Sequence, residues 1–327
     1  MGHAESAVLP LAAGLRPGTV LPVARYRLRF RMQADLMLPE YSGSLLRGQF
    51  GDALRRTACM TGAKTCPGCP LLRTCPYPAI FEAPAPDLQQ AKKFSQVPNP
   101  YVIEPPAFGT RRVAAGDVLQ FGIVLVGRAL DQLPLIVFAM ERAFGRGIGR
   151  QRVAGCLEDV VWQHQAGESS VWDEQCRNLL PHEPRITVPM LEDCRTASLE
   201  IATPLRLQLQ GHPLGPGEVT PRKLLTAILR RSGLLFEIHS DWPDMSKDAP
   251  MLARRAEALS DVRNLQWRDW TRYSSRQQAE MTLGGVVGNW EITGGLGPLA
   301  TWLWFGQWLH VGKNATMGMG HYVANFY

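Results

Sequence analysis

Two long stretches of this chain alternate between strand-like and helix-like segments, and each stretch contains a glycine-rich loop after its last helix. In the first stretch an apolar helical run, Leu133–Phe144, leads into the turn Gly145–Gly149. In the second stretch Leu299–Leu309 leads into Gly312–Gly320. Both have the order strand, helix, strands, helix, strand, which is the order of the ferredoxin-like βαββαβ unit. This pattern predicts an α+β fold with two tandem ferredoxin-like (RRM-like) domains.

The segments around these stretches set the expected domain boundaries. Residues 1–20 are rich in small residues, proline and glycine, and they predict a loose N-terminal extension. The first domain is expected over residues 21–165 and the second over 197–327. Between them, residues 166–196 show little periodicity and predict a linker. The proline-rich stretch Ala83–Ala107 predicts a loop across the surface of the first domain.

The composition allows a large core and gives a basic protein. The 327 residues carry 35 Lys and Arg against 29 Asp and Glu, a net charge of +6. This balance is consistent with a polyanionic partner, but GC-rich coding DNA produces the same excess of arginine. No run of eighteen apolar residues appears, and the N-terminus lacks the basic head and apolar core of a signal peptide. We therefore expect a cytoplasmic protein with no membrane partner.

The segment Val23–Met32 alternates between apolar and basic residues, which predicts a strand. The basic face carries four arginines: Arg25, Arg27, Arg29 and Arg31. Because like charges on one face repel, one interpretation is a surface that follows RNA phosphates. The other is a solvated or partly paired edge strand. RNA contacts are also expected from basic residues of the first predicted helix and of the first glycine-rich turn: Arg47, Arg146 and Arg150.

Four of the seven cysteines lie within seventeen residues: Cys59, Cys66, Cys69 and Cys75. The inner Cys-Pro-Gly-Cys turn directs two thiolates toward one point, and four thiolates complete a tetrahedral Zn²⁺ site. An iron–sulfur cluster uses the same ligands, and free thiols are the third possibility. With no histidine nearby, we expect a structural metal knuckle inserted in the first domain and no catalytic metal. An odd total of seven cysteines, four of them crowded into one short segment, also indicates a reducing compartment.

Aromatic and basic side chains interleave at the end of a predicted strand, Leu265–Tyr273, and just beyond it. The residues concerned are Trp270, Arg272, Tyr273 and Arg276. Aromatic rings stack on bases and arginines hold phosphates, a combination used to bind single-stranded or hairpin RNA. The alternative is that the tryptophans belong to the core and that the arginines pair with nearby acidic residues.

The second glycine-rich loop follows His310 and contains one cation, Lys313. Its glycines, which let a backbone approach a phosphate closely, are Gly312, Gly318 and Gly320. The loop is not a nucleoside-triphosphate P-loop, because Asn314 replaces the required Ser or Thr and because Gly306 and Gly312 are one residue too far apart. His310 can transfer protons near neutral pH, or it can simply close a helix whose C-terminal dipole favours its cation.

Four collinear segments resemble one known family. They are Leu46-Arg-Gly-Gln-Phe-Gly-Asp-Ala-Leu-Arg-Arg56, the cysteine cluster with Pro76-Tyr77 and Phe81-Glu82, Trp270–Gln277 leading into Met281–Gly288, and the loop Gly312–Gly320. The family is that of the CRISPR-associated endoribonucleases that process precursor CRISPR RNA, in the RAMP superfamily. The resemblance extends from about Arg25 to Tyr327.

The resemblance implies a function as well as a fold. In these enzymes the ribose 2′-hydroxyl attacks the adjacent phosphodiester without a metal, leaving a 2′,3′-cyclic phosphate and a 5′-hydroxyl. We expect His310 as general acid or base, Lys313 as stabilising cation and Tyr273 as a second proton carrier. Many relatives place a histidine or tyrosine on or just after the first helix. Here that helix has no histidine, and only Tyr41 lies just ahead of it.

That departure keeps other functions open. The chain could be a non-cleaving RAMP subunit that binds CRISPR RNA within an effector complex, with the other subunits as partners. It could also cleave with no histidine, through positioning and charge alone. A function outside the family, as a zinc-braced nucleic-acid-binding protein, is supported only by the cysteine cluster and the basic charge.

Overall fold

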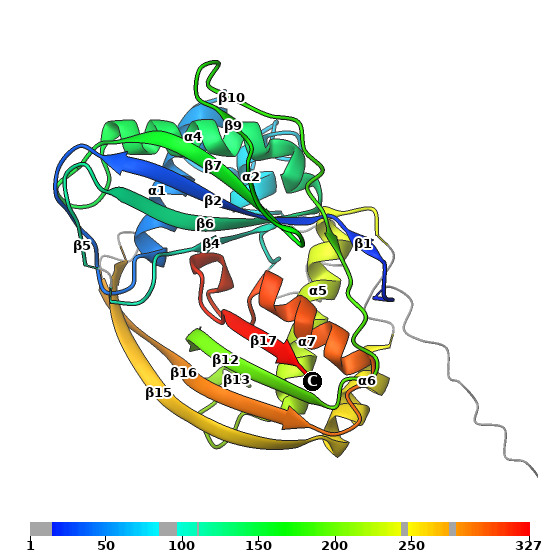
Figure 1. Cartoon of the computed structure of the whole chain (residues 1–327). Helices are drawn as coiled ribbons and strands as arrows, with labels where there is room; N and C mark the ends of the chain where they lie inside the picture. The colour runs from blue at the N-terminus through cyan, green and yellow to red at the C-terminus, as the bar shows by residue number, and fades with distance from the viewer. Residues whose placement is uncertain (1–14, 85–96, 110, 243–247, 275–278) are drawn as a thin grey trace, which may run out of the picture.

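The computed structural model describes residues 15–84, 97–109, 111–242, 248–274 and 279–327, with the side chains of these ranges except 271–282. Its strands form two main antiparallel sheets, with helices on and between them (Figure 1). The expected class, a mixed fold of helices and antiparallel sheets, is confirmed.

The first sheet has five strands in the order β4-β6-β2-β7-β8. Their bounds are Tyr101–Glu104 (β4), Val118–Val126 (β6), Val23–Met32 (β2), Gly155–His164 (β7) and Gly167–Ser170 (β8). Strand β2 lies in the middle, where Tyr26 is opposite Ile123 on one side and Trp162 on the other. The interpretation of this segment as an edge strand was therefore wrong.

One face of this sheet packs against helices α1 (Gly43–Ala58) and α4 (Leu133–Arg146). As its alternation predicts, β2 buries Tyr26, Leu28 and Phe30 completely on this face and places its arginines on the other. Burying each such side chain contributes roughly 1.5–3 kcal/mol to stability, so the apolar half of the alternating pattern is what fixes the strand in the sheet.

The second sheet has four strands in the order β15-β16-β12-β17. Their bounds are Ser260–Ser274 (β15), Ala279–Thr293 (β16), Thr196–Leu205 (β12) and Tyr322–Phe326 (β17). Its helices are α5 (Pro221–His239), α6 (Ala249–Arg255) and α7 (Pro298–Leu309). The central strands are β2 and β6 in the first sheet and β12 and β16 in the second. A helix follows each of these four strands in the chain: α1, α4, α5 and α7. The two halves of the chain thus repeat one strand order.

The two halves share a helix layer, because α5 and α7 lie between the sheets (Figure 1). The second face of the first sheet contributes four valines to the core around these helices: Val23, Val102, Val124 and Val126. The same face carries the arginines of β2. Both apolar and ionic contacts therefore join the halves.

The remaining elements are short. They are α2 (Pro76–Phe81), the 3-10 turns η1 (Gly127–Gln132), η2 (Ala256–Ala258) and η3 (Ala315–Met317), and the strand pairs β1 (Val20–Leu21) with β11 (Ile186–Thr187), β3 (Leu36–Met37) with β5 (Arg112–Val113), β9 (Trp172–Asp173) with β10 (Asn178–Leu179) and β13 (Gln208–Leu209) with β14 (His212–Pro213).

Three segments that were expected to be irregular carry structure. Strand β4 lies inside the proline-rich stretch, where its apolar run is too short to show periodicity. The expected linker contains β8 to β11, and β8 extends the first sheet. Leu15, in the expected N-terminal extension, is only 4% exposed and joins the core between the halves. Short pairings such as these depend on partners that are remote in sequence.

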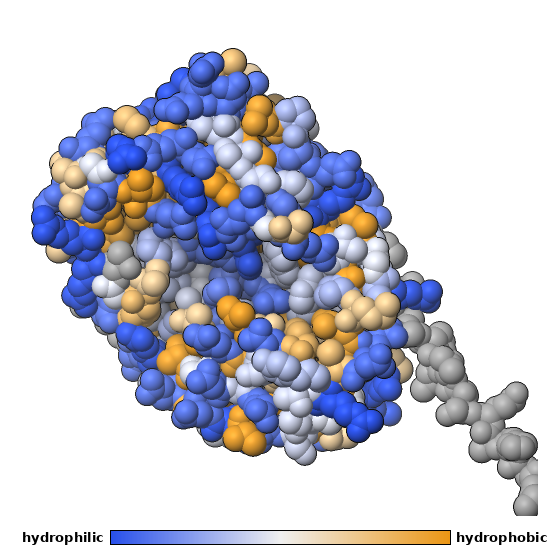
Figure 2. Space-filling view, in the orientation of Figure 1, coloured by the Kyte–Doolittle hydropathy of each residue, from blue (hydrophilic) through white to orange (hydrophobic). Residues whose placement is uncertain are grey.

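Apolar side chains are scattered in small patches over the face shown in Figure 2, and the boundary between the halves is recessed there. No helix in the part of the chain that the structure describes is both long enough and apolar enough to cross a membrane.

His239, the last residue of α5, makes a pH-sensitive contact between the halves. It is 7% exposed, and its Nε2–H donates to the carbonyl of Pro98 at 2.7 Å. Burial lowers its pKa to about 4, and the charges of Arg128 and Arg231 act in the same direction against that hydrogen bond. The unfolded chain takes up this proton near pH 6.5, so stability is lost as pH falls from there toward 4.

As the pH falls from 7 to about 4.5, we expect the lowered pKa of His239 to reduce the free energy of unfolding by roughly 1–3 kcal/mol. A His239→Gln variant keeps a donor for the Pro98 carbonyl but does not titrate, so its stability should fall less over the same range. Urea unfolding at a series of pH values measures both proteins. Equal pH dependence in the two would contradict this assignment.

Candidate functional site

The second glycine-rich loop lies between the two halves and packs against the first sheet (Figure 1). It leaves α7 at His310, turns through η3 and leads into β17. Five residues of its second half are buried: Ala315, Met317, Gly318, Met319 and Gly320. Much of the loop that was expected to face a phosphate therefore faces protein.

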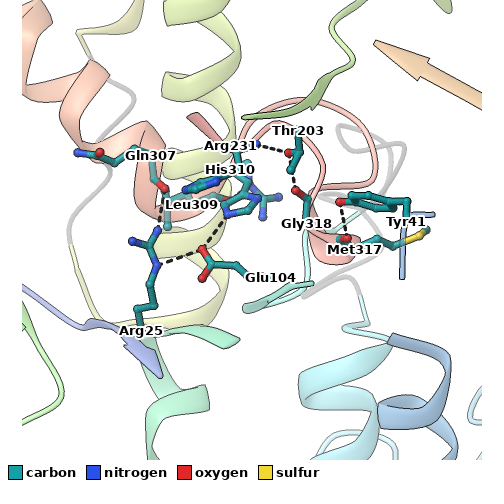
Figure 3. Close-up of polar contacts among 11 residues, drawn as sticks. Arg25, Tyr41, Glu104, Thr203, Arg231, Gln307, Leu309, His310, Met317 and Gly318 are labelled. Carbon is teal, nitrogen blue, oxygen red and sulfur yellow. Dashed lines mark hydrogen bonds and ion pairs between the residues drawn. The ribbon is translucent and has the colours of Figure 1, made fainter. Parts of the chain in front are cut away.

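Hydrogen bonds from both halves hold the backbone of this loop (Figure 3). Tyr41, just ahead of α1, donates its hydroxyl to the carbonyl of Met317 at 2.8 Å. Thr203 of β12 donates its hydroxyl to the carbonyl of Gly318 at 2.7 Å. Buried carbonyls need such partners, because leaving one unpaired costs about 1–3 kcal/mol. The loop is thus fixed by residues that the sequence places far apart.

Gly318 and Gly320 have a packing reason to be glycine. Both adopt left-handed φ, 88° and 71°, which other residues avoid. A Cβ on Gly318 would also run into Pro105 and lie 2.7 Å from the carbonyl oxygen of Ile103. A Cβ on Gly320 would collide with the carbonyl of Val311. Close contact with the protein explains these two glycines without any phosphate.

His310 closes α7 with a side chain that is 1% exposed. Its Nε2–H donates to Oε1 of Glu104, on β4, at 2.9 Å. Nε of Arg25, on β2, lies 3.0 Å from the same oxygen, and its Nη2 donates to the carbonyl of Gln307 at 2.9 Å. Figure 3 shows this chain of contacts between the two halves.

The charges of this cluster are fixed by their surroundings. Burial alone would raise the pKa of Glu104, but the Arg25 guanidinium and the hydrogen bond and charge of His310 lower it to about 2. The His321 ring stacks on His310 with centroids 4.8 Å apart. Burial, together with the charge of His310, lowers the pKa of His321 to about 3. At neutral pH the carboxylate is ionised and His321 is neutral.

Glu104, His310 and His321 also bring three possible metal ligands within 4.8 Å of one another, and no other group of described residues does so. The contacts nevertheless favour an ion-pair network. Oε1 of Glu104 already serves both Arg25 and His310, and Oε2 lies against Gly122, where a Cβ would be 2.5 Å away. A dication at this point would also face the Arg25 guanidinium.

The arginines of β2 all have carboxylate partners. Besides Arg25, Arg27 pairs with Glu168 at 2.6 Å and Arg29 pairs with Asp159 at 3.5 Å. Arg31 pairs with Glu158. Ion pairs therefore account for the repeated charge on this face, as the partly paired interpretation expected. RNA contacts by Arg25, Arg27 and Arg29 stay a prediction.

The other predicted basic contacts differ in their surroundings. Arg47 lies over the ring of Phe81, 4.4 Å from its centroid. Arg146, Arg150 and Lys313 are exposed, and no carboxylate of the described residues forms an ion pair with them. Among the predicted RNA-binding cations, these three are therefore available to a polyanion.

Trp270 is 5% exposed and tilts against Tyr41, with ring centroids 4.6 Å apart. Leu283 and Met319 complete this cluster, which anchors the long β15–β16 hairpin to the first half. The burial favours a core role for Trp270 over base stacking. Arg276 and the side chains of Arg272 and Tyr273 lie outside the described part of the structure.

The four cysteines line one cavity between the end of α1 and the start of α2. Cys59 is the C-cap of α1 and Cys75 is the N-cap of α2. Among the described residues, the four cysteines do not form a compact group of metal ligands, so a shared metal would have to draw their sulfurs together. The donor set itself, four thiols with no histidine or carboxylate lining the cavity, suits Zn²⁺ or an iron–sulfur cluster.

Sequence reasoning missed Glu104 and Thr203, and it noted Tyr41 only as an aromatic residue ahead of the helix. Glu104 was hidden in the stretch expected to be a loop. The available signal was a single acidic residue directly after a short apolar run, Tyr101–Ile103, ahead of two prolines.

Comparison with known proteins gives two family matches. A family described as CRISPR-associated endoribonuclease Cas6 matches residues 199–322, and one described as an N-terminal domain matches residues 21–184. Cas6 from Thermus thermophilus in a product complex is 16% identical, with a TM-score of 0.55, covering 93% of this chain and 99% of that chain. No match was found among curated protein sequences.

A second similar structure is a partial Cas6-RT-Cas1–Cas2 complex, at 14% identity and a TM-score of 0.56, with 93% of this chain and 46% of that chain covered. At these identities the solved structures establish the shared fold. The family match assigns residues 199–322 to the family of the CRISPR-associated endoribonuclease Cas6, the family that the four collinear segments resemble. Nearly the whole chain shares the fold of Cas6 structures.

Replacing Gly318 with alanine should destabilise the protein by about 2–4 kcal/mol, because the new Cβ adds a clash to left-handed strain. Gly145→Ala is the matched control. That glycine lies in α4 with open space around it, so alanine should stabilise the helix by up to about 1 kcal/mol. Urea unfolding measures both, and equal stability of the two variants would contradict the packing role of Gly318.

Proposed function

We propose that this protein is a metal-independent endoribonuclease that binds CRISPR repeat RNA and cleaves it to mature CRISPR RNA. The observation that carries the proposal is the match of residues 199–322, glycine-rich loop included, to the family of CRISPR-associated endoribonucleases. The proposed reaction is attack of the ribose 2′-oxygen on the adjacent phosphorus. The bond to the 5′-oxygen then breaks, which leaves a 2′,3′-cyclic phosphate and a 5′-hydroxyl.

Such a reaction needs proton carriers and a cation near the scissile phosphate. Lys313 is exposed at the start of the loop and is suited to stabilise the developing phosphorane charge. Tyr273 remains our candidate proton carrier. The first candidate from the sequence, His310, is poorly suited to proton transfer with RNA because its side chain is 1% exposed. His321 is partly exposed, with its pKa lowered to about 3.

We further propose that the two halves are tandem ferredoxin-like domains over residues 21–165 and 197–327. The repeated strand order supports this assignment, with the central strands β2 and β6 in one sheet and β12 and β16 in the other. Exposed cations would hold the RNA backbone, and Arg146 and Arg150 are available for this because they have no carboxylate partner among the described residues. Contacts by Arg47, Arg272, Arg276 and Gly312 belong to the same proposal.

One observation favours a second function. Helix α1 has no histidine, and His310, which directly precedes the glycine-rich loop, is buried. A non-cleaving subunit that binds CRISPR RNA within an effector complex would need no proton carrier at all. The fold it shares with chains of Cas6-RT-Cas1–Cas2 complexes is compatible with either function beside other protein partners.

The cleavage assay uses end-labelled repeat RNA in EDTA, beside the same RNA with 2′-deoxyribose at the cut site. We expect one discrete product from the first RNA and none from the second, because the deoxy substrate lacks the nucleophile. Lys313→Ala should slow cleavage by about 100- to 1,000-fold, a loss typical of removing one stabilising group. Tight binding without a cut would favour the non-cleaving subunit, and absence of binding would overturn both functions.

We also propose that Cys59, Cys66, Cys69 and Cys75 hold one structural metal, with Zn²⁺ favoured over an iron–sulfur cluster. The four thiols around one cavity support this. The metal would tie the end of α1 to α2 and supply stability, since ligand binding to a folded site stabilises the fold.

Purified protein should contain about one zinc per chain, and Cys66→Ser with Cys69→Ser should lose it and unfold at lower temperature. Elemental analysis and thermal unfolding measure both effects. Cys194→Ser, a substitution outside the cluster, is the control and should leave the metal content unchanged. Bound iron with visible absorbance would indicate an iron–sulfur cluster in place of zinc. Protein purified without any metal would contradict the proposal.

A further inference from the structure

We infer that Arg25, Glu104 and His310 form an interlock that positions the glycine-rich loop for the reaction, with His310 as a positioning residue and not a proton carrier. The inference rests on the proposed function for its role in catalysis. Its structural part, that the interlock fixes the loop, stands on contacts alone.

The first step of the argument is where the three residues come from. Arg25 lies on β2 and Glu104 at the end of β4, both in the first sheet. His310 ends α7 and directly precedes the loop. Nε2 of His310 and Nε of Arg25 approach the same oxygen of Glu104, at 2.9 and 3.0 Å. One carboxylate therefore ties the start of the loop to the centre of the first sheet.

The second step is that Arg25 and the end of α7 make further contacts that hold them in place. Arg25 lies over the ring of Trp308, 4.6 Å from its centroid, and donates to the carbonyl of Gln307. Nε of Arg231, on α5, donates to the carbonyl of Leu309 at 3.0 Å. These bonds satisfy the last carbonyls of α7, which have no partner within the helix. The direction in which the chain leaves α7 is thereby set.

The third step is that Glu104 lies next to the surface on which the loop rests. Its neighbours Ile103 and Pro105 are the groups that a Cβ on Gly318 would strike. The carboxylate and the contact surface move together, because they are consecutive residues of one strand end. Holding His310 against Glu104 therefore also holds the second half of the loop against β4.

The fourth step concerns protonation. An ionised carboxylate only accepts hydrogen bonds, so Nε2 of His310 must carry a hydrogen and donate it in the bond to Glu104. Nδ1 is buried and has no hydrogen-bond partner among the described residues. With the side chain 1% exposed, neither nitrogen can reach an RNA bound at the surface. A glutamine places an amide nitrogen where Nε2 lies, so it can replace the bond without supporting acid–base chemistry.

Hydrogen exchange tests the structural part on the full chain without RNA. Peptides that cover residues 311–322 should exchange at least about tenfold faster in Glu104→Ala, whereas a peptide from β6 should be unchanged. Asp35→Ala is the control, because Asp35 also pairs with an arginine, Arg112 at 2.7 Å, but in an exposed pair that is not part of the interlock. His310→Gln should stay within about threefold of the parent. Unchanged exchange in Glu104→Ala would overturn the inference, whether or not the protein cleaves RNA.

Single-turnover cleavage across pH tests the catalytic part. His310→Gln should keep cleavage within about tenfold of the parent with the same pH profile, and His310→Ala should lose more. A general acid or base would instead cost about 10²–10⁴-fold in both variants and remove one limb of the profile. That outcome, with loop exchange intact, would make His310 a proton carrier and overturn our inference. Failure of the unmodified protein to cleave would count against the proposed function alone, since hydrogen exchange still decides the interlock.

Discussion

The contact between the glycine-rich loop and strand β4 is the constraint on which the rest of the site depends. Gly318 has no room for a side chain between Ile103 and Pro105, and Tyr41 binds the carbonyl next to it. Because the loop is pressed this closely onto the first sheet, the two halves must dock in one orientation. The exposed part of the loop, where Lys313 lies, is then presented at a fixed place.

Burying charge at this boundary works only because the charges are matched. The Glu104 carboxylate contacts the Arg25 guanidinium and the His310 imidazole, and these two groups lower its pKa to about 2 despite burial. Removing one partner of such a group typically costs 3–5 kcal/mol, since the other charge is left buried without compensation. A buried network of this kind fixes geometry more strictly than apolar contacts do, because each hydrogen bond has a direction.

The arginines of β2 illustrate how one sequence pattern serves different purposes along one strand. At one end Arg25 is 16% exposed and joins the halves, and farther along Arg27, Arg29 and Arg31 pair with carboxylates of β7 and β8 near the surface. Exposed pairs contribute little stability, about 0–1 kcal/mol each. Exposed cations without a carboxylate partner among the described residues include Arg146 and Arg150 around the turn after α4 and Lys313 at the start of the second loop.

The sequence by itself determined the elements whose pattern repeats within a few residues: the alternation of β2, the apolar runs of α4 and α7, and the succession of strands and helices in both halves. It also determined the family, through motifs that stay recognisable without a structure. Only the tertiary structure decided that β2 is central, that β4 lies in a proline-rich stretch, that Trp270 is buried and that His310 faces Glu104. The physical reason is that local periodicity reports which side of an element is apolar. It carries no information about which remote residue, 206 positions away in the case of Glu104 and His310, covers that side.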